Sequence, residues 1–196
     1  ALDRVRLLGD LVVGAFFAHA KDKDREAERK RRLTLVENWL AAEQKGQGQK
    51  SAELHAELKD LQATLRQTQV PFHWMVEFPE VFHTARPDPL DGNRVNGAAY
   101  VEAFVGNPPF MGVAFITEQL GEGYVPWLQA TFPGTQGKFD LSALFFRRAA
   151  DLLGAHGTIG LIATNTIGQG DTRATGLQKL VEQGFTIYAA EVDRPW

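Results

Sequence analysis

The alternation of strand-like and helical patterns after residue 98 restricts the fold of this chain more than any other feature. We predict buried strands at residues 99–105, 158–164 and 186–192 and an amphipathic helix at 141–153. Strands that alternate with helices lie parallel where a helix crosses over between them. Apolar residues make up 44% of the 196 residues, which is enough for a core of ordinary size. The sequence therefore predicts an α/β sheet.

Glycines and capping residues predict where the helices of this region end. We expect Gly154 and Gly157 to stop the helix at 141–153. A second helix should begin with Asp171 or Thr172 as its cap and run to about residue 182.

Residues 1–67 have the periodicity of helices. Apolar residues recur at spacings of three and four on both sides of a polar loop at 44–50. We expect a helical hairpin, so that the chain divides into a helical region, 1–69, and an α/β region, 70–196.

Two segments allow either a nucleic-acid or a structural interpretation. Residues 21–32 carry seven basic and four acidic side chains, and their mixed signs favour a solvated helix surface over a DNA-backbone contact. The aromatic segment 72–82 could stack bases, but we favour a short strand and loop that closes the core. Because the net charge is −3, any basic surface for DNA must be local or lie elsewhere in the protein.

Several classes of protein are excluded by the composition. We find no apolar run long enough for a membrane span, no signal-peptide pattern and no cysteine. His73 and His83 do not have the spacing of metal ligands, so we predict no metal site. A cytoplasmic protein is expected.

The sequence Asn107-Pro108-Pro109-Phe110 follows the first predicted strand directly. In an open α/β sheet, ligands bind outside the carboxyl ends of the strands. The prolines stiffen the loop and remove two amide donors, so that the loop presents oxygen acceptors. The Asn107 side-chain oxygen and the Pro108 carbonyl can accept both hydrogens of an exocyclic amine, and Phe110 offers a face on which a planar base can stack.

With this motif, the chain resembles the adenine-specific (N6) DNA methyltransferases of restriction-modification and phage-defence systems. Asn-Pro-Pro-aromatic after a buried strand is the catalytic motif of such class I enzymes, which use S-adenosylmethionine. The likeness extends over residues 70–196, and the helical part matches only loosely. The features that add to it lie at 138–141, 157–165 and 168–173.

The resemblance implies a partial Rossmann-like sheet, the second half of the class I fold. It implies that Asn107 and Pro108 hold the amine of an adenine flipped out of double-stranded DNA, that Phe110 stacks on the base, and that Phe145 lies beside the cofactor's adenine. The implied source is a bacterium or an archaeon.

The glycine-rich donor motif of this family, Asp-Pro-x-x-Gly-x-Gly, is missing from the sequence. In close relatives it precedes the catalytic motif. We therefore expect this chain to be a fragment that is inactive alone and that works with the remaining domains of its parent polypeptide.

A second candidate site follows the strand at 158–164. If that strand lies beside the strand at 99–105, Asn165 and the loop at 168–170 should lie near Asn107. Arg173, with the free amides of the helix that begins near Asp171, could contact the DNA backbone. The other interpretation, which we favour slightly, is a plain loop with a solvated Arg173.

Two other functions remain open from the sequence. Methyltransferases for the glutamine of release factors, or for guanine N2 in ribosomal RNA, use a very similar loop, although Phe110-Met111-Gly112 and the segment 168–173 favour DNA. The chain could also be a non-catalytic DNA-binding module.

Overall fold

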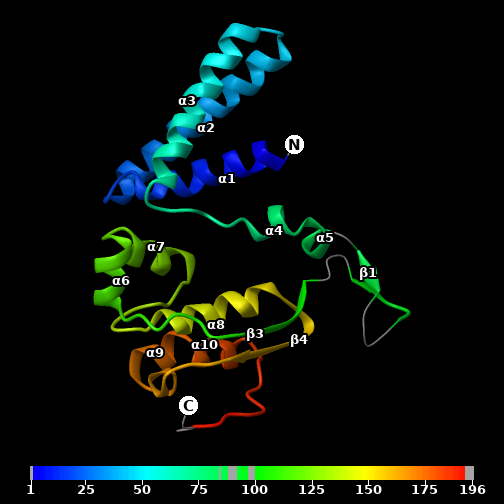
Figure 1. Ribbon diagram of the computed structural model, residues 1–196, viewed down its shortest axis with the longest axis vertical. Coiled ribbons are helices and arrows are strands. Elements are labelled where there is room, and N and C mark those ends of the chain that lie inside the picture. The colour runs from blue at the N-terminus through cyan, green and yellow to red at the C-terminus, as the bar shows by residue number, and fades with distance from the viewer. Residues whose placement is uncertain (1, 84, 88–91, 97–99, 193–196) are drawn as a thin grey trace. The chain divides into compact units, whose positions relative to one another are not determined.

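A computed structural model describes residues 2–83, 85–87, 92–96 and 100–192 (Figure 1). The chain forms two compact units, a helical unit at residues 1–79 and an α/β unit at 80–196. In the part of the chain that is described, no helix is both long and apolar enough to cross a membrane.

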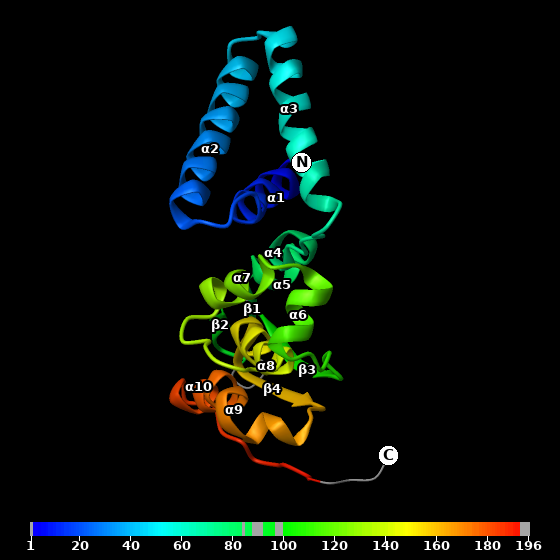
Figure 2. The same ribbon diagram turned by 90° about the vertical axis from the view of Figure 1, so that its left-hand side faces the viewer.

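The helical unit consists of three long helices and a short one. These are α1 (Leu2–Phe17), α2 (Asp22–Gln44), α3 (Gly48–Arg66) and α4 (Trp74–Glu77). Figure 2 shows α2 and α3 as a hairpin, as the periodicity predicts, and α1 packs against both. Leu7, Leu11, Trp39 and Leu58 form the core, each at most 3% exposed.

A buried carboxylate joins the helices of this unit. Asp10 is completely buried, and its oxygens accept hydrogen bonds from Gln62 Nε2 at 2.6 Å and Arg66 Nε at 2.7 Å. His73 Nε2 lies 2.8 Å from the other carboxylate oxygen. Burial alone would raise the pKa of Asp10, but the hydrogen bonds of these three partners outweigh it and hold the pKa below its ordinary value.

The segment 72–82 forms helical turns, so the predicted strand is wrong. Phe72, Trp74 and Phe78 contact one another through their rings, and Phe72 is 55% exposed. Phe82 alone is buried, and it packs edge-on against Tyr100.

The α/β unit alternates helices with short strands. Its elements, in chain order, are α5 (Pro79–Phe82), β1 (Arg86–Pro87), β2 (Val95–Asn96), β3 (Val101–Gly106), α6 (Val113–Leu120), α7 (Tyr124–Thr131), α8 (Leu141–Leu152), β4 (Leu153–Leu161), the 3-10 turn η1 (Asn165–Gly168), α9 (Gly170–Thr175) and α10 (Leu177–Glu182). β1 and β2 form an antiparallel pair, and β3 and β4 form a parallel pair. The connection from β3 to β4 runs through α6, α7 and α8, of which α8 packs against β4, and α9 and α10 pack against α8. The α/β class and the parallel arrangement are confirmed.

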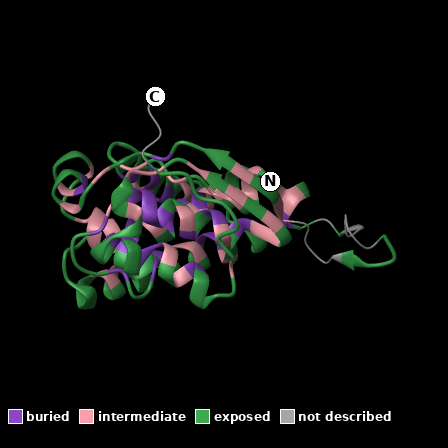
Figure 3. Ribbon diagram, turned by 90° about the horizontal axis from the view of Figure 1, so that it is seen from below, coloured by how far each residue is buried: buried purple, intermediate pink, exposed green. Residues whose placement is uncertain are grey.

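The strands are less buried than we predict. No residue of β3 or β4 is buried, and Val105 is 88% exposed (Figure 3). The core lies between α6, α7 and α8, where Ile116, Phe139 and Leu144 are at most 2% exposed. Among the described residues no third strand extends the β3–β4 pair, and a two-stranded pair covers little apolar surface. The apolar residues of these strands are therefore left at the surface. The start of the predicted strand at residue 99 lies outside the described residues.

The helix predicted at 141–153 is confirmed as α8, but Gly154 and Gly157 do not cap its end, because both glycines lie in β4. The chain leaves α8 directly into extended backbone at Leu153. The ladder shifts register between Val101 and Ala103, and a Cβ at Gly157 would meet the Val101 carbonyl oxygen at 3.1 Å. Gly157 therefore allows the close approach of the strands at this irregularity.

Two further predictions near the carboxyl end of the chain are wrong. The helix expected at 171–182 is broken at Gly176, where a Cβ would lie 2.8 Å from the Cβ of Ala143. Its cap is neither Asp171 nor Thr172, because Gln169 precedes the helix. The strand expected at 186–192 has no strand pairing among the described residues, and a β-prone segment without a ladder partner stays irregular.

Candidate functional site

The Asn107–Phe110 motif leaves the sheet at the carboxyl end of β3. Gly106 pairs with Leu161 of β4, and the Ile162 amide donates to the Gly106 carbonyl oxygen at 3.0 Å. Pro108 is buried, whereas Asn107 and Pro109 are exposed and Phe110 is 41% exposed. One proline thus anchors the loop while the asparagine and the aromatic ring stay accessible.

The carboxyl end of β4 lies at the same edge of the sheet. Because β3 and β4 are parallel and paired to their last residues, the chain after each strand leaves the sheet on one side. Asn107 follows β3 immediately, and Asn165 opens η1 soon after β4 and is exposed. The Thr164 and Thr166 hydroxyls lie 2.6 Å apart and hold the turn around Asn165.

The start of α8 is joined to the chain just after the motif. The Leu141 amide donates to the Met111 carbonyl oxygen at 2.8 Å, and Gly112 forms an antiparallel bridge with Asp140. Asp140 also caps α8, since its Oδ1 accepts from the Ser142 amide at 2.9 Å. The motif loop therefore rests on a capped helix end.

Side chains in the first turn of α9 accept hydrogen bonds from the segment that precedes α8. Asp171 Oδ2 accepts from the Lys138 amide at 2.7 Å, and Thr172 Oγ1 accepts from the Asp140 amide at 3.2 Å. The sequence marks these residues as helix caps, and nothing in it shows that their acceptors serve a distant segment.

Arg173 and Phe145 take different places in the structure. Arg173 is exposed on α9 and lies at a shallow depression with Val181 and Ile187 of the following segment. α9 has only six residues, and its first-turn Asp171 accepts from the Lys138 amide, so the structure does not support the expected phosphate contact through the free amides of this helix. Phe145 is 43% exposed on α8, four residues after Leu141.

A buried arginine braces the loop before α8, and the sequence does not reveal it. Arg147 donates to the Pro133 carbonyl oxygen at 3.1 Å and to Thr135 Oγ1 at 3.2 Å. Burial lowers its pKa from the ordinary value. The only signal is an arginine placed on the apolar side of an amphipathic helix.

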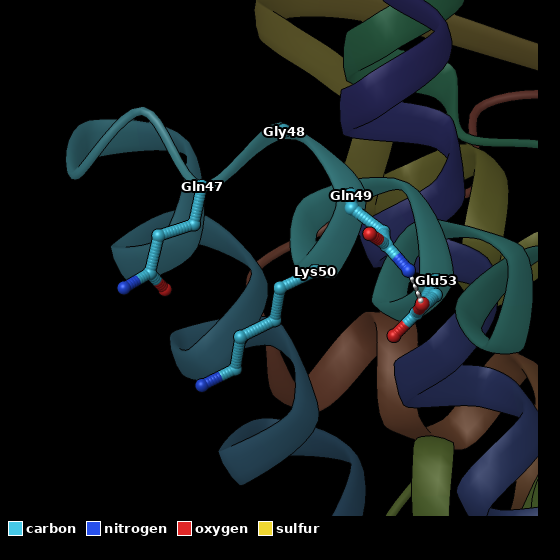
Figure 4. Close-up of a pocket in the computed structure, with 5 residues that line it drawn as sticks. All are labelled: Gln47, Gly48, Gln49, Lys50 and Glu53. Carbon is cyan, nitrogen blue, oxygen red and sulfur yellow. Dashed lines mark hydrogen bonds between the residues drawn. The ribbon is translucent and has the colours of Figure 1, made fainter.

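The turn between α2 and α3 contains another depression, drawn in Figure 4. Its lining residues are all exposed, and Gln49 donates to Glu53 at 3.0 Å. Because none of these lining residues is buried, we assign no functional site to this turn.

The comparison that decides the family is a match to the model of the Eco57I restriction-modification methylase over residues 17–186. The chain belongs to this family of restriction-modification methylases. No curated protein and no solved structure matches it.

The match takes in both units of the methylase. It includes α2 and α3, so most of the helical unit is part of the family pattern, although the resemblance seen in the sequence is loose there. Asn107, Phe110, Phe145, Asn165 and Arg173 all lie within the matched range. Membership makes this a DNA methyltransferase of the restriction-modification type.

Proposed function

We propose that this methylase acts on the N6 amine of an adenine flipped out of double-stranded DNA, and that the Asn107–Phe110 loop holds that amine. The observation that carries the proposal is the position of the loop. It leaves the carboxyl end of a parallel strand with Asn107 and Phe110 exposed, in a chain of a DNA-methylating family.

The chemistry of the loop is that of an acceptor pair. Asn107 offers its side-chain oxygen and Pro108 its carbonyl oxygen to the two hydrogens of the amine. Holding both hydrogens draws the nitrogen lone pair out of conjugation with the ring and makes it a better nucleophile. Pro108 and Pro109 lack amide hydrogens, so the loop backbone has no donor there that would compete for those acceptors.

The target base must leave the helix before the loop can reach it. The exposed ring of Phe110 supplies a face on which the flipped base stacks. Family membership supports DNA over the protein glutamine and ribosomal guanine that similar loops methylate elsewhere.

Methylases of this kind take their methyl group from S-adenosylmethionine. The residues present fit only part of a site for it. Phe145 offers an exposed aromatic face on α8, but the sequence holds no Asp-Pro-x-x-Gly-x-Gly element. We therefore propose that this chain supplies the amine-holding part and lacks methyl transfer alone, which an assay with tritiated S-adenosylmethionine and the purified chain checks.

We extend the proposal to two polar residues at the same edge of the sheet. Asn165 and Arg173 follow β4, and both are exposed. We assign them to the DNA backbone beside the flipped base, where a guanidinium can hold phosphate oxygens through paired hydrogen bonds.

The test of the proposal is substitution of Asn107 in the enzyme expressed from its complete open reading frame. Asn107→Ala should lower the single-turnover rate of adenine methylation by at least about 10²-fold, as losing one preorganised polar contact does elsewhere. DNA affinity should stay within about twofold, because it comes mainly from phosphate contacts.

Phe110 provides the matched comparison within the same loop. Phe110→Ala should cost about tenfold, since it removes stacking and leaves the acceptors, and Phe110→Trp should keep most activity. Near-normal turnover by Asn107→Ala would overturn the assignment of the loop.

A further inference from the structure

A short stretch before α8 connects the motif loop with α9. We call residues 137–141 the bridging segment. Its Leu141 amide donates to the Met111 carbonyl oxygen at 2.8 Å, directly after Phe110. Its Asp140 also pairs with Gly112. The two residues that follow the motif loop are therefore paired with the bridging segment.

Two other amides of the bridging segment donate to side chains of α9. Lys138 donates to Asp171 Oδ2 at 2.7 Å, and Asp140 donates to Thr172 Oγ1 at 3.2 Å. Thr172 is 6% exposed, so its hydroxyl is withdrawn from water and the contact does not compete with solvent. A carboxylate acceptor makes the first contact stronger than a neutral hydrogen bond.

The backbone around Asp171 is fitted to this side chain. Gly137 has φ +71°, which disfavours any residue with a Cβ, and a Cβ there would overlap the Asp171 carboxylate. α9 itself is held close to α8, because Gly176 lies against Ala143. A displacement of α9 therefore moves the bridging segment, and with it the residue that follows Phe110.

We propose that Asp171 and Thr172 are positioning residues for methyl transfer, which set the place of the motif loop through the bridging segment. The inference rests on the proposed function of that loop. Transfer to an amine needs the reacting atoms aligned, and a misplacement of about 1 Å can cost on the order of 10²-fold in rate. Both side chains are engaged by the bridging segment, so their loss should change the rate and leave DNA affinity in place.

The first experiment tests the structural connection without catalysis. Amide hydrogen exchange of Leu141, measured by NMR in this chain, should become at least about tenfold faster in Asp171→Ala than in the parent, because the bridging segment loosens from the motif loop. Asp171→Asn keeps an acceptor oxygen and should stay within about threefold. Asp151→Asn is the control, because it changes an exposed carboxylate on α8, the helix that begins at Leu141. Unchanged exchange of Leu141 in Asp171→Ala would overturn the inference.

The second experiment tests the consequence for the reaction, in the enzyme expressed from its complete open reading frame. Asp171→Ala should lower the single-turnover rate about 10- to 100-fold with DNA affinity within about twofold, and Asp171→Asn should recover most of the rate. The pair Thr172→Val and Thr172→Ser decides the matter if Asp171→Ala does not fold, because only serine keeps the acceptor. Gln178→Ala, which removes a hydrogen bond on neighbouring α10, should behave as the parent.

The outcomes separate the two proposals. An unchanged rate in Asp171→Ala, or a rate loss that Asp171→Asn does not recover, overturns the positioning role while Asn107→Ala still tests the loop. Normal turnover by Asn107→Ala overturns the function of the loop and with it the positioning role, whatever Leu141 exchange shows about the connection.

Discussion

The helical unit and the α/β unit place their charged and polar side chains differently. In the helical unit, Arg29 and Arg31 pair with glutamates on their own helix, and the buried Asp10 has three partners. At the sheet edge of the α/β unit, Asn107 and Arg173 are exposed, and among the described residues Arg173 has no ion pair. The first arrangement pairs charges within and between helices, and the second leaves them accessible to solvent. The same residue types therefore serve stability in one unit and are available for recognition in the other.

Removing the buried carboxylate should give the largest effect and should stay within the helical unit. Asp10→Ala leaves Gln62 and His73 without their acceptor, which costs about 1–3 kcal/mol of unfolding free energy for each, while Arg66 is 39% exposed and can turn to water. Urea unfolding, followed by hydrogen exchange of peptides from each unit, measures it. Asp60→Ala, an exposed carboxylate on α3, is the control. Equal destabilisation of both units by Asp10→Ala would mean that they unfold together.

Acid should weaken the helical unit by a somewhat smaller amount. The hydrogen bond from Arg31, helped by Arg32 and opposed by burial, lowers the pKa of Glu28 to about 2 from 4.5. A carboxyl whose pKa is depressed on folding stabilises the protein above its unfolded pKa, and that contribution is lost as the pH falls through the folded pKa. The unfolding free energy of the helical unit should therefore fall between about pH 5 and pH 2, with no more than about 3 kcal/mol due to Glu28.

Glu28→Gln isolates this contribution. The variant cannot titrate at this position, so its stability should depend less steeply on pH over the same range, as acid titration followed by circular dichroism at several urea concentrations would show. A pH dependence identical to that of the parent would mean that the ion pairs of Glu28 contribute nothing measurable to stability, as is found for many surface pairs.

The smallest expected effect separates the exposed arginine from a paired one. Arg173→Ala, in the enzyme expressed from its complete open reading frame, should weaken DNA binding of all sequences and reduce the slope of log K against log salt by about one unit. Arg29→Ala should change neither, because its guanidinium is already engaged by Glu26 at 2.7 Å. Salt-dependent fluorescence anisotropy with a labelled duplex compares the two. If log K falls equally steeply with log salt for Arg173→Ala and the parent, Arg173 is a solvated surface residue that does not contact DNA.

Local signals in the sequence predict the helices and the parallel strands well. The leucine spacing before residue 67 predicts the hairpin, and the apolar runs at 99–105 and 158–164 predict two strands. The structure pairs these strands in parallel as Val101–Gly106 and Leu153–Leu161, so the second begins five residues earlier than predicted. Both follow from periodicity along the chain. The place of Asn107 also follows, because the carboxyl end of a parallel strand is defined once the strand is.

The features that sequence reasoning misses depend on contacts between distant residues. The break at Gly176 reflects the approach of Ala143, and the role of Gly157 reflects the carbonyl of Val101. Apolar composition alone likewise suggests that β3 is buried, whereas burial depends on what covers the strand. The partners of Asp171 and Arg147 are segments 33 and 12 to 15 residues away, which no local pattern indicates.

The left-handed backbone at Gly137 has a consequence for how such sequences can diverge. Because a Cβ at 137 and the carboxylate at 171 claim the same space, the two positions are not free to vary independently. A lineage that gains a side chain at 137 must accept left-handed backbone there and must move the carboxylate at 171 away from the Lys138 amide, so a lineage that keeps this hydrogen bond favours glycine at 137. Related sequences should therefore show these positions changing together, and an Asp retained opposite a non-glycine residue should be rare.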